Sequence, residues 1–567
     1  MLAGVNLHNS AVMYKELSSS PYFVDKTDIL KLLVPLFSTN MKYICITRPR
    51  RFGKTSITQM LSAYLCKTDE TGDIFKNLVV AKQPFYRDHL NKHNVVYMDL
   101  SRLPDNCDSY KEFNDILVGQ LENDLRKQYP NIFNEDYSRT NKCSSIWDMF
   151  FAVNLEENES FIFIIDEWDA IFQTGFLKED DKLKYLTFLK CLLKDQPYVE
   201  FAYMTGVLPI ASATSGSSLN MFFEYNMAKS LRYNDYFGFT QTEVNMLFER
   251  YIALCQSNGV NQRITLEGMS KWYNGYTSEH GESIYNPRSI VGAFSSNELA
   301  SYWTRTGPMD EVFYYVKNNV ADVREDIVKL AAGETISVRM LEYAATQMRT
   351  ESRGEIISAM VVYGFLTFDI NDSFWKGSPW RVLRVPNYEI RLQFELALEK
   401  KEMGYVAKLA LASEKMLEAT LAGDTATMEA ILTTAHDTET PSLRYNNEGD
   451  LAALVNLIYL AARDNYEPRR EENVGAGRTD VIYYPYDHSA AGFIIELKVD
   501  DTPENSIQQI KDRRYAQRFY GDMSAYSEIM GRGGYSGKVL AVGMTYDKAT
   551  KTHHCKVEYL KRSGSVV

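Results

Sequence analysis

The residues best suited to chemistry lie in one short stretch, where an apolar run, Tyr43–Ile46, meets a polar loop that contains Gly53, Lys54 and Thr55. We expect a strand, a tight loop and then a helix from Ile57, an arrangement that gathers free backbone N–H groups and the positive helix end around one point and so favours phosphate. Lys54 would reach the outer phosphates and Thr55 would place its hydroxyl on Mg²⁺. The remaining predicted ligand-binding residues of the loop are Arg50, Arg51, Phe52, Gly53 and Ser56.

The loop departs from the pattern G-x-x-x-x-G-K-[ST], because Arg48 occupies the place of the first glycine. Its backbone therefore needs side-chain support to follow the usual course. A Gly-Lys-Thr tripeptide alone is weak evidence, and a solvated loop is the alternative.

A second set of polar residues follows the apolar run 161–165, which is typical of a strand buried on both faces of a parallel sheet. Asp166 and Glu167 would emerge at its carboxyl end, where ligands bind in open α/β sheets. We expect Asp166 to hold Mg²⁺ and Glu167 to polarise an attacking water. The alternative is a core strand followed by an acidic turn.

Two further strands complete this expectation. The strand 201–206 would lie beside the phosphate-loop strand and present Thr205 as a sensor of the γ-phosphate, although a strand-capping threonine fits equally well. The strand 94–101 is also expected to neighbour the phosphate-loop strand. The alternation of strands and helices indicates a doubly wound parallel α/β sheet.

A third constellation lies near the C-terminus, where Asp480 precedes an apolar strand and the next strand carries Glu496 and Lys498. Glu496 and Lys498 are two residues apart and so face the same side of a strand. The two acids could bind Mg²⁺ while the amine orients a water, and Glu448 is a further metal-ligand candidate. The alternative is a domain that keeps this fold without catalytic activity, in which the acids only pair with Arg478 and Lys498.

The residues between these sets suggest four regions. We predict an ATPase-type core at 1–240, a helical lid at 241–305 with an N-cap at Thr240, a connecting region at 306–440, and an α/β domain resembling a restriction endonuclease at 441–567. Within 306–440, a helix followed by a hairpin suits a winged-helix DNA binder, but a packing module is favoured. Alanine-rich helices should follow from about 405 to 436.

The totals describe an ordinary globular chain of 567 residues with 45% apolar residues and a formal charge of −12. Residues 441–567 carry 17 basic and 17 acidic residues, and the basic segment 511–518 would supply positive surface there. The start of the chain lacks signal-peptide character and no run suits a membrane span. We therefore expect no membrane partner and a cytoplasmic or otherwise intracellular location, nuclear in a eukaryote. Seven scattered cysteines suggest neither zinc nor disulfides.

Several motifs together resemble the AAA-ATPase-like family, in which the ATPase region is commonly fused to a C-terminal PD-(D/E)XK nuclease domain. The motifs are YFVDKT (22–27), RPRRFGKT (48–55), IIDEWDAIF (164–172), MTGV (204–207), FGFT (237–240), WYNGY (272–276) and YNPRSI (285–290). Arg48 is a trait of that family, whereas Trp168 and Arg288 depart from its expected Tyr and Trp.

The resemblance implies ATP and Mg²⁺ as cofactors and an ATPase that controls a Mg²⁺-dependent DNA endonuclease. Nucleic acid, with DNA favoured, would be the partner. An arginine finger supplied by a second copy would require a homo-oligomer, and Arg232, Arg288 and Arg305 are its candidates or phosphate sensors. The alternative is a nucleotide-dependent regulatory or nucleic-acid-binding scaffold with an inactive nuclease fold.

Overall fold

The computed structural model of the chain divides into two compact units, residues 1–309 with 337–390 and residues 310–336 with 391–567. The structure describes residues 2–7, 9–104, 107–133, 144–210, 219–226, 232–277, 283–303, 323–331, 333–339, 352–369, 380–399, 405–437, 451–452, 454–455, 458–459, 461–462, 465–470, 481–513, 515–516, 519 and 535–560.

The first unit is built on a six-stranded sheet with the order β1-β3-β4-β5-β2-β6. All neighbouring pairs are parallel except β1 with β3, as expected for a doubly wound α/β fold. The strands are β1 (Ala3–Val5), β2 (Tyr43–Thr47), β3 (Asn94–Asp99), β4 (Phe161–Asp166), β5 (Val199–Gly206) and β6 (Phe223–Asn226).

The strand order confirms one predicted neighbour of the phosphate-loop strand and corrects the other. β5 pairs with β2, with Thr205 opposite Ile46. The prediction that strand 94–101 lies beside β2 is wrong, because β5 and β6 occupy both edges of β2 and β3 pairs with β4 and β1. Closeness in sequence is only a statistical guide to closeness in a sheet.

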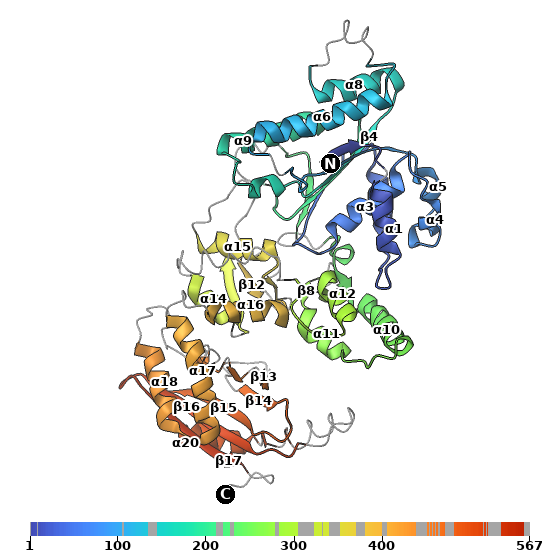
Figure 1. Ribbon diagram of the computed structural model, residues 1–567. Helices are drawn as coiled ribbons and strands as arrows, with labels where there is room; N and C mark the ends of the chain where they lie inside the picture. The colour runs from blue at the N-terminus through green and yellow to red at the C-terminus, as the bar shows by residue number, and fades with distance from the viewer. Residues whose placement is uncertain are drawn as a thin grey trace. The chain divides into compact units, whose positions relative to one another are not determined.

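Side-chain alternation assigns the helices of this unit to two layers. Ile162 and Ile164 of β4 join a core with α3 (Lys54–Leu65) and α1 (Asn9–Ser18), whereas Phe161 and Phe163 contact Phe150 of α8 (Ile146–Glu157). Figure 1 shows α6 (Tyr110–Gln128), α8 and α9 (Glu179–Leu193) together on one side of the sheet and α1 and α3 on the other. The shorter helices α2, α4 and α5 span Leu30–Leu33, Gly72–Phe75 and Tyr86–His89.

The region predicted as a lid is helical as expected. It contains α10 (Gln241–Ser257), α11 (Leu266–Tyr273) and α12 (Pro287–Ser296) beside a small sheet of β7 (Phe239–Thr240), β9 (Ser283–Tyr285) and β8 (Tyr276–Thr277). The predicted N-cap at Thr240 is confirmed, because its side chain and that of Glu243 form a capping box. Glu243 also pairs with Lys26 at 2.6 Å, which joins α10 to the segment before the phosphate loop.

The same unit includes the predicted helix and hairpin of the connecting region. α15 (Arg353–Tyr363) leads to β11 (Thr367–Phe368), which pairs antiparallel with β12 (Trp380–Arg384). β10 (Ile336–Arg339) adds a third strand next to β12. This unit ends within α16 (Tyr388–Glu399).

The second unit has a five-stranded sheet in sequence order, β13 (Tyr466–Arg470), β14 (Val481–Pro485), β15 (Gly492–Val499), β16 (Val539–Asp547) and β17 (Thr552–Leu560). β15 and β16 are parallel and the other pairs antiparallel. Its helices are α14 (Val323–Ala331), α17 (Tyr405–Ala422), α18 (Thr425–Asp437) and α20 (Pro503–Asp512). The alanine-rich helices predicted from about 405 to 436 are therefore confirmed as α17 and α18, which are separated at Gly423-Asp424.

Alternation again separates the two faces of this sheet. Ile507 and Ile510 of α20 share a core with Ile494 of β15, whereas the ring of Phe493 of β15 packs against that of Tyr459. Glu496 and Lys498 have the same parity as Ile494 and therefore lie on the α20 face. Among the described residues, no helix is long and apolar enough to span a membrane.

Candidate functional site: a phosphate loop facing two carboxylates

The phosphate loop joins β2 to α3 in the predicted way. Gly53, with φ of 88°, is the N-cap of α3, and Arg51 also has a left-handed φ, of 68°. Lys54, the first residue of α3, is almost fully buried, and its Nζ donates to the Pro49 carbonyl at 3.3 Å. The loop therefore curls around its own lysine at the positive end of a three-turn helix.

Arg48, which replaces the first glycine of the pattern, supports the loop from within the protein. Its guanidinium donates to the carbonyls of Thr47, Tyr225 and Arg232 and to Oδ1 of Asn234, at 2.6–3.0 Å. The side chain is 1% exposed and lies over the ring of Phe237. Charge-assisted hydrogen bonds thus hold the end of β2 where other phosphate loops use glycine.

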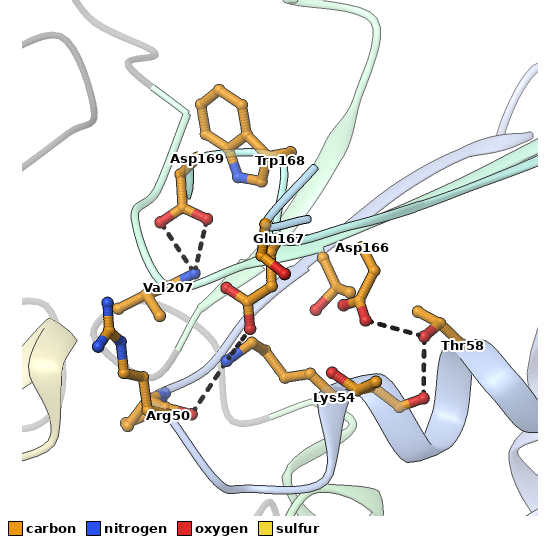
Figure 2. A network of polar contacts seen from close by, with 12 residues as sticks. Arg50, Lys54, Thr58, Asp166, Glu167, Trp168, Asp169 and Val207 are labelled. Carbon is orange, nitrogen blue, oxygen red and sulfur yellow. Dashed lines mark hydrogen bonds and ion pairs between the residues drawn. The ribbon is translucent and has the colours of Figure 1, made fainter. Parts of the chain in front are cut away.

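The carboxylates of Asp166 and Glu167, at the carboxyl end of β4, face this loop, as Figure 2 shows. Oε1 of Glu167 lies 3.3 Å from Nζ of Lys54, and Glu167 has a left-handed φ of 50°. Asp166 is fully buried and its Oδ2 accepts a hydrogen bond from Thr58 at 3.2 Å. Burial and the nearby Glu167 raise the pKa of Asp166 to about 7.

The arrangement of Asp166 fits a cation. Its Oδ1 is buried and has no hydrogen-bond partner among the residues that the structure describes, and the hydroxyl of Thr55 lies close enough to lower the pKa of the carboxyl. A carboxylate and a hydroxyl oxygen are ligands that Mg²⁺ accepts, with waters and phosphate oxygens completing its shell. A cation here would also offset the burial that raises the Asp166 pKa.

Asp169 is a residue that sequence reasoning missed. Its carboxylate accepts the backbone N–H groups of Val207 and Leu208 at 2.7–3.1 Å and so ties the turn after β4 to the end of β5 (Figure 2). Burial raises its pKa to about 6. The only signal in the sequence was a third acid, three positions after Asp166.

Thr205, the predicted sensor, lies inside the sheet. It is fully buried and its hydroxyl donates to the carbonyl of Ile46 at 2.8 Å. It is not among the residues that line the cavity described next. The role of a sensor stays a prediction, and the present contact is the one expected of a strand-capping threonine.

A cavity of about 1070 Å³ opens in front of the loop, within the first unit. It is large enough for a nucleotide. The predicted residues that line it are Arg50, Arg51, Phe52, Gly53, Lys54, Thr55, Ser56 and Glu167. Lining residues that the sequence did not single out as ligands include Tyr22, Phe23, Asp99, Arg102, Gln173 and Phe239. Arg288, named as one of three alternatives, also lines it, whereas Arg305 lies outside the described residues.

The last constellation is described only in part. Glu496 is 1% exposed and its Oε1 lies 3.4 Å from Nζ of Lys498, so the predicted common face is confirmed. Glu448, Arg478 and Asp480 lie outside the described residues. In the part of the chain that the structure describes, no group of three or more acids, histidines or cysteines could hold a metal.

The predicted basic segment near the C-terminus is partly neutralised. Lys511 pairs with Glu558 at 2.6 Å, and Arg513 donates to the hydroxyl of Tyr515 at 2.9 Å. Arg514 and Arg518 lie outside the described residues.

Comparison with known proteins agrees with the loop and the carboxylates. Residues 13–214 match the family model AAA-ATPase_like, described as "Predicted AAA-ATPase". An uncharacterized protein from the 5′ region of vnfD in Azotobacter chroococcum mcd 1 is 22% identical over 511 residues, which cover 88% of this chain and 90% of that protein.

Two solved structures are similar over much of the chain. The ORC2 protein of Aeropyrum pernix, in ADPNP and ADP complexes, is 12% identical and covers 69% of this chain and 93% of its own, with a TM-score of 0.27. Cdc6p of Pyrobaculum aerophilum is 10% identical and covers 66% and 93%, with a TM-score of 0.26. These scores are too low to carry an argument. The family match and the geometry together support an ATPase region of the AAA type at the N-terminal end of this chain.

Proposed function

We propose that the first unit binds ATP with Mg²⁺ and hydrolyses it. The observation that carries this proposal is the meeting of Lys54 and Glu167, 3.3 Å apart, at the floor of a nucleotide-sized cavity whose wall is the start of α3. A lysine at a helix N-terminus opposite a carboxylate pair is the arrangement that phosphoryl transfer requires.

Each residue has a distinct role in this proposal. Lys54 exchanges its contact with Glu167 for the outer phosphates, which frees Glu167 to orient and polarise the attacking water. Thr55 and Asp166 would hold Mg²⁺, which neutralises charge on the phosphates. Backbone N–H groups at Gly53 to Ser56 face the phosphates, and Asp169 keeps the turn that carries Glu167 in place.

The test is nucleotide binding and phosphate release by the full chain, with Lys54→Ala and Glu167→Gln as variants. Lys54→Ala should lose ATP affinity by at least about tenfold, the loss of one charge-assisted contact. Glu167→Gln should still bind ATP but release phosphate at least about 100-fold more slowly. Hydrolysis by Glu167→Gln at the rate of the unaltered protein would exclude Glu167 as the group that polarises water.

We further propose that the ATP state controls a Mg²⁺-dependent DNA endonuclease in the second unit. The support is the buried Glu496 beside Lys498 on β15, followed by α20 and the parallel strand β16, in the order that the sequence resemblance implies. Asp480 immediately precedes Val481, whose partner across the hairpin is Ile495, next to Glu496. Asp480, Glu496 and Glu448 would be its metal ligands and Lys498 its water-orienting group.

The second candidate is a nucleotide-dependent scaffold in which this unit only binds nucleic acid. The Lys498–Glu496 ion pair favours it over cleavage, because the amine that would orient the attacking water already has a protein partner.

Cleavage of supercoiled plasmid with Mg²⁺ or Mn²⁺, with and without ATP, separates the two candidates. Loss of cutting in Asp480→Ala and loss of the ATP response in Lys54→Ala would support the nuclease and its control. ATP hydrolysis without any nicking would support the scaffold. Sedimentation of the same samples with ATP would test the homo-oligomer that an arginine finger in trans requires.

A further inference from the structure

Arg50 and Arg51 of the phosphate loop are held from outside by Tyr302 and Trp303, about 250 residues further along the chain. The carbonyl of Tyr302 accepts a hydrogen bond from Arg51 at 3.3 Å, and the indole of Trp303 donates to the carbonyl of Arg50 at 2.9 Å. Trp303 is 5% exposed, and its ring packs against Phe365. The loop therefore depends on a distant segment for its outer shape.

That segment is in turn fixed by one buried carboxylate. Oε1 of Glu389, near the start of α16, accepts the backbone N–H groups of Tyr302 at 2.6 Å and Trp303 at 2.7 Å. Its Oε2 accepts the hydroxyl of Ser289 at 2.6 Å. Ser289 follows Arg288, which lines the cavity. Glu389 itself is 1% exposed and all of these contacts lie within the first unit.

We propose that Glu389 is a positioning residue of the phosphate site, which sets Arg50, Arg51 and Arg288 for contact with the outer phosphates of a nucleoside triphosphate. Glu389 does not line the cavity, so it acts through the Tyr302–Trp303 peptide and through Ser289. This inference rests on the proposed binding of ATP. It adds the group that organises Arg50, Arg51 and Arg288, which together form a cationic wall of the site.

The charges on this wall support the proposal. Burial lowers the pKa of Arg51, and the neighbouring Arg288 and Arg50 lower it further, while Glu389 raises it. The guanidinium of Arg51 thus lies close enough to those of Arg50 and Arg288 to be repelled by both, with Glu389 as a nearby counter-charge. Such a wall discriminates in favour of the ligand with the most phosphate charge.

No uncharged side chain can accept all of the hydrogen bonds that the Glu389 carboxylate accepts. Burial raises the pKa of Glu389, while its three donors and Arg51 lower it, because they favour the anion that accepts all three hydrogen bonds. Glutamine matches its shape but carries no charge and has one oxygen fewer. Glu389→Gln therefore tests the position of the wall with little change in packing.

The experiment measures affinities for ATP and ADP, by competition with a fluorescent ATP analogue, and the KM and kcat of hydrolysis in the full chain. Glu389→Gln should weaken ATP binding by at least about tenfold, the value of one hydrogen bond to a charged acceptor, and ADP binding by a clearly smaller factor. KM should rise more than kcat falls. Glu395→Gln is the matched control, because Glu395 is a buried carboxylate on the same helix that pairs with Arg391.

A second variant covers the case in which Glu389→Gln does not fold. Trp303→Phe keeps the aromatic packing and removes the indole donor to Arg50, and it should raise KM for ATP about threefold to tenfold. ATP and ADP affinities of Glu389→Gln within twofold of those of the unaltered protein would overturn the inference and leave the proposed function standing. An unaltered protein that binds no ATP would overturn both.

Discussion

Replacing Asp166 with asparagine should stabilise the nucleotide-free protein while removing its response to Mg²⁺ and ATP. Asp166 is fully buried and its pKa is raised from 3.8 to about 7. Between about pH 4 and pH 7, Asp166 is therefore protonated in the folded state and ionised in the unfolded state. The free energy of unfolding falls as the pH rises through this range and is constant above it. Asparagine cannot ionise and escapes this cost.

The size of the effect follows from the shift. A shift of about three pKa units, at about 1.36 kcal/mol each, means that ionised Asp166 lowers the free energy of unfolding by about 4 kcal/mol at pH 8.5. At pH 6, which lies below the folded-state pKa, the loss is about 3 kcal/mol. Weakening of the hydrogen bond from Thr58 would subtract about 1 kcal/mol at both values. We therefore expect Asp166→Asn to gain about 3 kcal/mol at pH 8.5.

Urea denaturation of the full chain at both pH values, with and without Mg²⁺ and ATP, measures this gain. The exposed Asp180 on α9 offers a control, since Asp180→Asn should change the free energy of unfolding by less than about 0.5 kcal/mol. Mg²⁺ with ATP should stabilise the unaltered protein but not Asp166→Asn. A nucleotide-free Asp166→Asn protein that is less stable than the unaltered protein at pH 8.5 would refute the reasoning.

Three other substitutions test separate parts of the structure. Arg48→Gly restores the usual glycine but removes four hydrogen bonds of a buried side chain, so it should lower the free energy of unfolding in urea by more than about 4 kcal/mol; an unchanged midpoint would contradict the support assigned to Arg48. Gly364→Ala places a methyl group 2.8 Å from Pro49 at a φ of 85°, and should cost about 2 kcal/mol and raise KM for ATP. Glu496→Gln should abolish metal-dependent plasmid cleavage at an unchanged ATPase rate, and cleavage that persists would remove Glu496 from the proposed metal site.

The sequence predicted those parts of the site that are encoded locally. The apolar run into Lys54 and Thr55, and the five apolar residues before Asp166 and Glu167, each specify a strand and its polar end within about ten residues. Parallel strands then bring the two ends to the same edge of the sheet, which is why these residues meet. The hairpin with Glu496 and Lys498 was predictable for the same reason.

The parts that the sequence did not predict depend on contacts between distant residues. No local pattern pairs Arg48 with Asn234, or Trp303 with Arg50 and Glu389. The position of β3 was also wrong, since strand order depends on which edges pair and not on the pattern within a strand. Thr205 shows the same limit, because a threonine at a strand end gives no sign of where its hydroxyl points.

The contact between Gly364 and Pro49 has a practical consequence for dissecting the chain. A Cβ atom on Gly364 would lie 2.8 Å from the Pro49 ring, and Tyr276 donates to the Gly364 carbonyl at 2.7 Å. A fragment cut after the helical lid, near residue 305, would leave one side of the phosphate loop bare and without Glu389. The smallest piece worth expressing as an independent enzyme therefore keeps all of α16 and ends after residue 399. A protease that cuts between 309 and 337 should leave residues 1–309 and 337–390 associated, because they belong to one compact unit.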